Sequence, residues 1–222
     1  MTRVVLKLGG RIAAAAAPRA LRLRAAGHEV IVVHGAGPQI TDELARRGVQ
    51  PAFVRGRRVT DARTLEIVRE SLVAVGAEVS AALGPTAIQL AGDEIGLRAR
   101  RLEGLGLVGD PVPCRPAAIE NALEQRLIPV VSPLAVGPLN VNADEAAAAL
   151  ALGMDAERVV FTTDVPGVLV DGEVVDRLDA SAVSRMLRDG ELEGGIVPKL
   201  LAAVRAARLG VRAEIGVTEV LA

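Results

Sequence analysis

Three charged residues stand where the surrounding sequence makes a charge costly or well placed for chemistry. Lys7 lies inside VVLKLGG, at positions 4–10, and a lysine within an apolar strand is unfavourable unless it meets an anion. Lys199 follows a glycine-rich turn in GGIVPK, and Asp144 ends NVNAD at a predicted helix start. Two ammonium groups, one carboxylate and backbone N–H groups in glycine-rich turns are the parts that position and neutralise a phosphoryl group in transfer. The alternative for each lysine is an ordinary solvated position.

The turn HGAGPQI, at 34–40, predicts an anion site. Small residues at 35–37 let the backbone approach a ligand closely, and Pro38 suits the first turn of a helix. The unpaired N–H groups of a helix start attract an anion. The spacing matches neither a Walker A loop nor a dinucleotide fingerprint, and a tight strand-to-helix packing turn is the alternative.

Composition excludes several classes of function. The chain has 222 residues, a net charge of −1 and 1% aromatic residues, with no Trp and no Tyr. Neither nucleic acid nor an acidic membrane is favoured as a partner, and stacking platforms for single-stranded nucleic acid are excluded. Cys114 is the only cysteine, which rules out an internal disulfide and fits a reducing cytosol. Apolar stretches are interrupted well before about 18 residues, so no membrane span is expected.

Short Val- and Ile-rich runs alternate with Ala-, Leu- and Arg-rich stretches. The runs predict strands, the longer stretches predict helices, and their alternation predicts a three-layer αβα sandwich around a mostly parallel sheet. Ligands bind outside the carboxyl ends of strands in such a sheet. The predicted strands are 3–8, 29–33, 87–90, 128–132 and 158–163; the helices are 12–26, 38–47, 61–83, 115–126, 143–152, 179–188 and 197–209; the hairpins are near 52–59, 96–108 and 168–176.

Several stretches together resemble a known family. VVLKLGG, VIVVHGAGPQI, GRRVTD, LIPVVSPL, NVNADEAAAALA, TTDVPGVL, GGIVPKL and GVTEV occur in family order between residues 4 and 220. On these motifs the chain resembles the amino-acid kinase superfamily and, within it, the acetylglutamate kinases. The resemblance implies one amino-acid kinase domain over 1–222, with a substrate and dimerisation lobe at about 1–136 and a nucleotide lobe at about 137–222.

The resemblance also implies a reaction. ATP, carried with Mg2+, would phosphorylate the γ-carboxylate of N-acetyl-L-glutamate, the second step of arginine biosynthesis. Lys7 would hold the moving phosphoryl group from one side and Lys199 from the nucleotide side. Asp144 would orient both lysines rather than act as a base, because the attacking carboxylate is already ionised at pH 7.

The same resemblance implies the binding residues. Arg58 would pair with the substrate α-carboxylate, for which a bidentate fork has the right shape, and Asn140 would take the acetamido group. Backbone N–H groups would come from Gly9, Gly10, Ala36 and Gly37, to the phosphates and to the attacking carboxylate. The nucleotide pocket would be lined by Asp164, Val165, Pro166, Gly167, Val168, Leu169, Glu191, Leu192 and Glu193.

The match to the family has departures. GAG replaces the usual three glycines, which is acceptable if Ala36 has a negative φ and its methyl fits beside the substrate, whereas a positive φ would cost about 1 kcal/mol. The segment 11–28 and the end of the chain are short, and Arg57 stands where the family commonly has Leu. Without an N-terminal helix before the first strand, the resemblance implies a cytoplasmic homodimer that is insensitive to arginine, with helix 61–83 as the candidate contact.

Two other functions remain open from the sequence. One is a kinase for a carrier-protein-bound aminoadipate or glutamate in lysine biosynthesis, for which Arg55, Arg57 and Arg58 could form a basic entrance. HGAGPQI keeps GPQI, which favours the free acetylated substrate. The other is a non-catalytic relative that binds ligand without turnover, suggested by Ala36 and the shortened segments.

Overall fold

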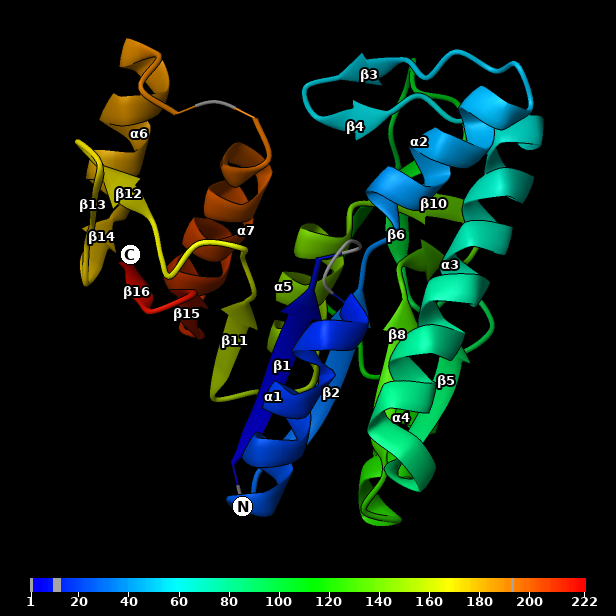
Figure 1. The fold of residues 1–222 in the computed structure, drawn as a ribbon, viewed down its shortest axis with the longest axis horizontal. Helices are drawn as coiled ribbons and strands as arrows, with labels where there is room; N and C mark the ends of the chain where they lie inside the picture. Colours follow the sequence, from blue (N-terminus) through cyan, green and yellow to red (C-terminus); the bar gives the residue numbers. More distant parts are fainter. Residues whose placement is uncertain (1, 10–12, 193) are drawn as a thin grey trace.

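An eight-stranded sheet forms the centre of the molecule (Figure 1). The structure is a computed structural model that describes residues 2–9, 13–192 and 194–222. All neighbouring strands are parallel except β15 and β16. The order is β14 (Arg177–Asp179), β16 (Thr218–Leu221), β15 (Arg212–Ile215), β11 (Arg158–Phe161), β1 (Arg3–Leu8), β2 (Glu29–His34), β8 (Ile128–Ser132) and β5 (Ala87–Ala91).

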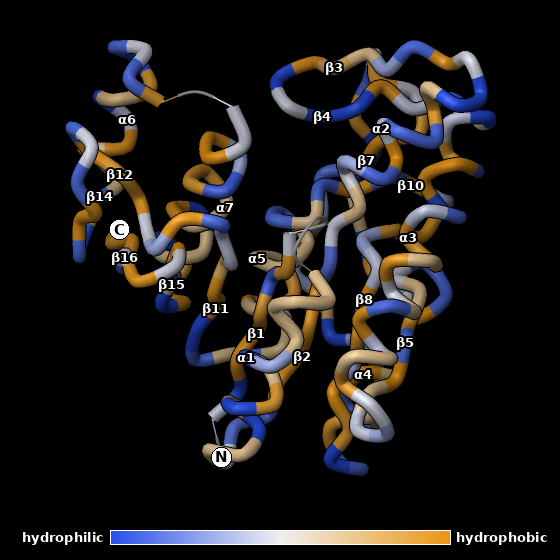
Figure 2. Tube along the Cα trace, in the orientation of Figure 1, coloured by the Kyte–Doolittle hydropathy of each residue, from blue (hydrophilic) through white to orange (hydrophobic). Residues whose placement is uncertain are grey.

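Alternation along the central strands builds two separate cores, one on each face of the sheet. In β1, Val4, Leu6 and Leu8 belong to one core and Val5 to the other, as the period of two in a strand requires. The first face is covered by α1 (Ala13–Ala25), α2 (Gly37–Arg46) and α3 (Ala62–Leu83). The second is covered by α4 (Ala117–Glu124), α5 (Ala143–Gly153), α6 (Ala180–Asp189) and α7 (Ile196–Arg208). The central strands are strongly apolar along their length (Figure 2), which is typical of a sheet buried on both faces.

Smaller elements lie beyond the main sheet. A four-stranded sheet has the order β6 (Ala99–Arg101), β7 (Val108–Pro111), β10 (Leu139–Val141) and β9 (Leu134–Ala135). Two hairpins stand apart, β3 (Phe53–Val54) with β4 (Arg57–Arg58) and β12 (Leu169–Val170) with β13 (Glu173–Val174), and a 3-10 turn covers Gly84–Thr86. Asp171 and Gly172 have positive φ of 52° and 83°, as expected for an Asp-Gly hairpin turn.

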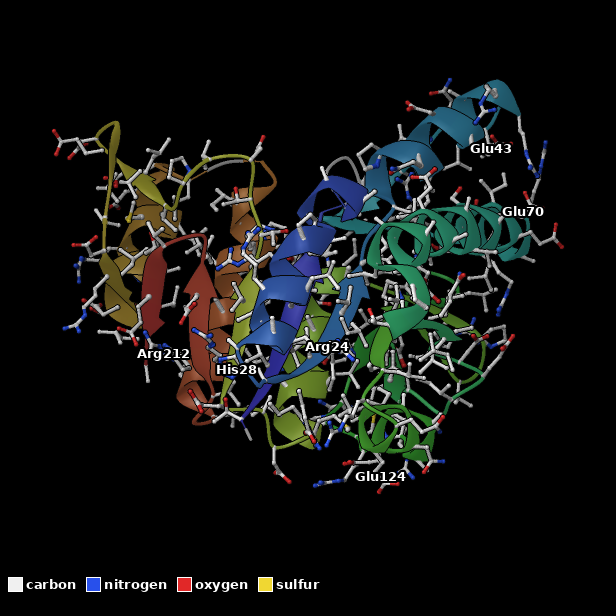
Figure 3. All side chains as sticks on the ribbon, turned by 60° about the horizontal axis from the view of Figure 1, so that its bottom comes forward. Arg24, His28, Glu43, Glu70, Glu124 and Arg212 are labelled. Atoms are coloured by element: carbon white, nitrogen blue, oxygen red, sulfur yellow. The ribbon has the colours of Figure 1, made fainter. Side chains whose placement is uncertain are left out.

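The predicted architecture is confirmed, and the boundaries differ by one or two residues. All five predicted strands and seven predicted helices are present, and each predicted hairpin region contains an antiparallel pair. The second strand of the hairpin near 96–108 is β7, which runs on to Pro111. The short strands β9, β10, β14, β15 and β16 were not predicted. In β15 and β16 the reason is visible. Arg212 pairs with Glu214 in its own strand and with Glu219 across the sheet, so these strands lack a continuous apolar run. Figure 3 labels Arg212 on this part of the sheet.

The strand order places one crevice at the carboxyl end of β1. The strand that follows β1 in the chain, β2, lies on one side of it in the sheet, whereas the later strands β11 and β15 lie on the other side. In open α/β sheets a ligand binds where the strand order reverses in this way. The N-terminal strands and the later strands lie on opposite sides of that point (Figure 1). Among the described residues, no helix is both long enough and apolar enough to cross a membrane.

Candidate active site

Lys7, Asp144 and Lys199 meet at the carboxyl end of β1. The Oδ1 atom of Asp144 lies 2.9 Å from Nζ of Lys7 and 3.1 Å from Nζ of Lys199. All three residues are buried, with exposed fractions of 7%, 6% and 8% respectively. Lys7 and Lys199 are the only two lysines in the sequence. The contact predicted for Asp144 with both lysines is therefore present in the structure.

One carboxylate between two ammonium groups leaves an excess of positive charge. Burial favours the neutral form of Asp144, but Lys7 and Lys199 outweigh it and hold the pKa of this carboxyl below its usual value. Burial and the neighbouring Lys7 lower the pKa of Lys199, while Asp144 opposes that shift. A buried cluster with a surplus cation is prepared for an anionic ligand such as a phosphoryl group.

The backbone around the cluster is held by polar side chains. Thr162, directly after β11, donates its hydroxyl to the carbonyl of Lys7 at 2.9 Å and accepts the N–H of Gly9 at 3.4 Å. Asn142 caps α5 by accepting the N–H groups of Asp144 and Glu145 at 2.8 Å and 3.2 Å. The end of β1 and the start of α5 are thereby fixed where the three charges meet.

A cavity of about 260 Å³ lies on one side of the cluster. Arg58 lines it and is 8% exposed. Its Nη2 donates to the hydroxyl of Thr41 at 2.9 Å and to the carbonyl of Gly37 at 3.2 Å, while Nη1 is buried with no hydrogen-bond partner among the described residues. Burial lowers the pKa of this guanidinium, and no carboxylate of the described residues forms an ion pair with it. A buried arginine without a counter-ion points to an anionic ligand.

The start of α2 and the residue Asn140 complete this cavity. Ala36 is the N-cap residue of α2 with φ of −138°, so the alanine in place of glycine carries no left-handed strain. Its methyl side chain cannot accept the helix N–H groups, which leaves the turn at Ala36 and Gly37 open to a ligand. Asn140 lines the same cavity and donates Nδ2 to the hydroxyl of Thr60 at 3.0 Å.

A larger cavity of about 700 Å³ lies on the other side, next to Lys199. Of the residues predicted to bind nucleotide, Pro166 does not line it; instead its carbonyl accepts the N–H of Val217 at 2.8 Å. Gly10 and Glu193 lie outside the described residues. The predicted residues that do line the cavity are Gly9, Asp164, Val165, Gly167, Val168, Leu169, Glu191 and Leu192.

Some residues of the site were not predicted. Pro38 lines both cavities, and Phe53 lines the smaller one with its ring centroid 4.6 Å from the guanidinium carbon of Arg58. Thr162 could have been found, because it stands at the carboxyl end of a predicted central strand, where side chains reach the ligand. Nothing in the local sequence around Phe53 indicated its place, since the contact depends on how the hairpin folds over α2.

Comparison with known proteins agrees with this geometry. The acetylglutamate kinase of Rubrobacter xylanophilus is 41% identical over 226 residues, covering 97% of this chain and 88% of that protein. The acetylglutamate kinase of Acidothermus cellulolyticus is 39% identical over 241 residues, covering 95% and 81%. The crystal structure of smu.665 from Streptococcus mutans UA159 has a TM-score of 0.90 at 27% identity and covers 99% of this chain and 98% of that one.

More distant structures share the fold. A carbamate kinase from Giardia has a TM-score of 0.71 at 14% identity, covering 99% of this chain and 98% of that one. The family model described as "Amino acid kinase family" matches residues 2–216, nearly the whole chain. The chain therefore belongs to the amino acid kinase family.

Proposed function

We propose that this chain transfers the γ-phosphoryl group of ATP to the γ-carboxylate of N-acetyl-L-glutamate, giving N-acetyl-L-glutamyl 5-phosphate and ADP. This is the second step of arginine biosynthesis. The observation that carries the proposal is Asp144 holding two buried lysines between a small cavity with an unmatched arginine and a larger one. Relatives up to 41% identical that bear the name acetylglutamate kinase support it.

The proposed transfer needs positioning and charge rather than a base. A carboxylate oxygen of the substrate attacks the γ-phosphorus, and the bond from that phosphorus to the ADP oxygen breaks. The acceptor is already ionised at pH 7, so no proton has to be removed. Lys7 on the acceptor side and Lys199 on the nucleotide side neutralise the equatorial oxygens, and Asp144 keeps both ammonium groups in place.

The small cavity suits an N-acylated amino acid with two carboxylates. Arg58 offers its unpartnered Nη1 to the α-carboxylate. Asn140 donates Nδ2 to Thr60, which leaves its carbonyl oxygen to accept the acetamido N–H. The γ-carboxylate would then lie against Lys7 and the N–H groups of Ala36 and Gly37. The N–H of Gly9, which makes only a long contact of 3.4 Å with Thr162, would turn to the phosphates.

The larger cavity suits the nucleotide. Val168, Leu169, Leu192 and Ile196 give it apolar walls, and Lys199 stands at its end nearest the cluster. We take Mg2+ to arrive with ATP, since this ion usually keeps phosphate and water ligands. In this assignment residues 1–136 form the substrate and dimerisation lobe, and residues 137–222 form the nucleotide lobe.

The carrier-bound alternative loses its main support. Of the three arginines offered as a basic entrance, Arg57 pairs with Glu145 and Arg58 is buried in the cavity. Only Arg55, at the hairpin turn, is free to face a carrier protein. The presence of Lys7, Asp144 and Lys199 disfavours the non-catalytic alternative. Burying charged side chains costs free energy, so a protein that had lost catalysis would be expected to lose them.

We further propose a cytoplasmic homodimer that does not respond to arginine. Helix α3 exposes Val73 and lies beside the edge strand β5, which exposes Ile88. An edge strand with apolar neighbours is a natural surface for a second copy. Sedimentation equilibrium with and without arginine tests this assignment: a monomer, or an oligomer that changes with arginine, would contradict it.

A coupled ADP-release assay with Mg-ATP tests the proposed reaction. N-acetyl-L-glutamate, L-glutamate, L-aspartate and N-acetyl-L-aminoadipate serve as acceptors, and hydroxylamine traps any acyl phosphate. We expect turnover and a hydroxamate with N-acetyl-L-glutamate alone. Release of ADP without hydroxamate, or silence with all four acceptors, would overturn the proposal.

A further inference from the structure

The β3–β4 hairpin forms one wall of the small cavity, although it belongs to neither of the larger sheets. Its strands have two residues each and are joined by Arg55 and Gly56, whose φ values are 49° and 77°. A hairpin this short is not stable in water by itself. Its position over the cavity therefore depends on contacts elsewhere. The backbone of Thr60, just after the hairpin, bonds to Leu105 and Leu107, and side chains of the hairpin supply the remaining contacts.

Two arginines anchor the hairpin on opposite faces. Phe53 pairs with Arg58 and Val54 with Arg57 in the antiparallel register, so the two neighbouring arginines leave the hairpin on different faces. Both still line the small cavity, Arg57 at its edge toward α5. Arg58 is held by α2 through Thr41 and Gly37. The side chain of Arg57 contacts Glu145 in the first turn of α5.

The contact of Arg57 with α5 is a two-point ion pair. Its Nη2 lies 2.5 Å from Oε1 of Glu145 and its Nε lies 3.3 Å from Oε2. The side chains are 26% and 17% exposed, so water screens the pair less than it would an exposed pair. Burial raises the pKa of Glu145 and Arg57 opposes that shift. Arg57 thus offsets part of the cost of burying this carboxylate.

The ion pair continues toward the nucleotide side. Asp110, on β7, lies with Oδ1 4.0 Å from Nη2 of Arg57 and 2.9 Å from Nη1 of Arg205. Arg205 belongs to α7, the helix that also carries Lys199. The hairpin, the small sheet and the nucleotide-side helix are therefore joined by one run of charges.

We propose that Arg57 is a positioning residue, whose ion pair with Glu145 latches the β3–β4 hairpin closed over the acceptor cavity and so presets Arg58 for the substrate. Without the latch the hairpin would lie over the cavity in only a fraction of the molecules. The apparent affinity for the acceptor would fall in proportion to that closed fraction. The identity of the acceptor rests on the proposed function, whereas the latch itself does not.

Hydrogen–deuterium exchange of residues 52–59 tests the latch without any ligand. Arg57→Leu and the isosteric Glu145→Gln should each exchange faster in this segment than the wild type. Arg55→Leu, which removes an exposed arginine from the same hairpin, is the matched control and should leave exchange unchanged. Equal exchange in the wild type, Arg57→Leu and Glu145→Gln would overturn the latch.

Calorimetry with N-acetyl-L-glutamate tests the consequence for binding. Arg57→Leu and Glu145→Gln should each raise the dissociation constant roughly fivefold or more. The double variant should be no weaker than the weaker single variant, because both changes break the same contact. Arg57→Lys should restore part of the affinity. In kinetics the loss should fall mainly on KM, with kcat at saturating acceptor much less affected.

The two experiments separate the possible failures. Additive losses in the double variant, or faster exchange with unchanged affinity, would overturn the role of Arg57 in acceptor binding. If the wild type binds no N-acetyl-L-glutamate, the proposed function fails, and the exchange comparison still decides whether the latch exists.

Discussion

The two sides of the site, which we propose for the acceptor and for the nucleotide, are built in different ways, although both end at Asp144. Lys7 is held in β1 between two strands, opposite Val33 of β2 and Phe161 of β11. Lys199 lies in the first turn of α7, whose N-cap Gly195 has no side chain to fix the helix start. The cavities differ as well, at about 260 Å³ and about 700 Å³.

This difference suggests a division of tasks. On the acceptor side, fixed polar groups surround a small space, and ion pairs hold its hairpin in place. On the nucleotide side, apolar residues line a roomier space beside a glycine-rich turn. Selection between acceptors should therefore depend on preset geometry, and the nucleotide side should tolerate more change.

The largest expected effect comes from removing either lysine. Lys7→Ala or Lys199→Ala should lower kcat on the order of 10²-fold or more, because each removes a donor that stabilises the transferring phosphoryl group. Steady-state kinetics with saturating Mg-ATP and acceptor measures this. If Lys7→Ala were impaired but Lys199→Ala were as active as the wild type, the proposed role of Lys199 in phosphoryl transfer would be wrong.

Asp144→Asn should change the ionisation of Lys199. Asp144 raises the pKa of that ammonium against burial and Lys7, so its loss should lower the pKa of Lys199 further. The alkaline limb of the kcat profile should then move to lower pH. Because the chain has only two lysines, NMR of protein labelled at the lysine side chains resolves both titrations directly. An unchanged titration of Lys199 would contradict the coupling.

His34 should make the folded protein sensitive to acid. It is fully buried at the end of β2, and its ring nitrogens find no hydrogen-bond partner within the described parts of the chain. Burial lowers its pKa to about 4, against a smaller opposing effect of the Gly35 backbone. The unfolded chain binds a proton near pH 6.5, which the folded chain does not, so stability is lost as the pH falls from 6.5 toward 4. At pH 5 the loss should be about 2 kcal/mol relative to pH 8.

Urea unfolding of the wild type and His34→Leu at pH 8 and pH 5 measures that loss. The variant lacks the titrating ring, so its stability should fall less over the same interval. The difference between the two proteins isolates His34 from the carboxylates that also titrate. Equal pH dependence would show that His34 binds its proton in the folded state as readily as in the unfolded one.

Arg58→Lys gives the smallest of these effects. The substitution keeps a positive charge but replaces a fork by a point charge, so KM for the acceptor should rise roughly tenfold with little change in kcat. KM for ATP should stay unchanged, because Arg58 lines only the acceptor cavity. An unchanged KM for the acceptor would place the α-carboxylate elsewhere.

Strong local patterns made the central fold predictable from the sequence. The strand 128–132 is a continuous apolar run, and its bounds agree with β8. The helix 61–83 begins after Asp61, which accepts the N–H of Thr64 at 2.7 Å as an N-cap side chain should. Lys7 could be recognised as a candidate site residue because a lysine within an apolar strand is unfavourable unless it meets an anion.

Features that depend on distant contacts could not be predicted. Arg57 and Glu145 are 88 residues apart, and nothing near either residue indicates the pairing. In the same way, the sequence cannot show which carboxylates lie near Arg58 in the folded protein. Only the structure shows that none of the described ones pairs with it. Pro166 illustrates the limit of motif transfer, since its neighbours line the cavity while its carbonyl is used by Val217.

Direct detection of the product is the most decisive measurement. Phosphorus NMR of wild-type protein with Mg-ATP and N-acetyl-L-glutamate should show an acyl-phosphate signal growing with ADP, removed by hydroxylamine and absent with Lys7→Ala. ADP accompanied only by inorganic phosphate in the wild type, with hydroxylamine giving no hydroxamate, would contradict transfer to a carboxylate at this site.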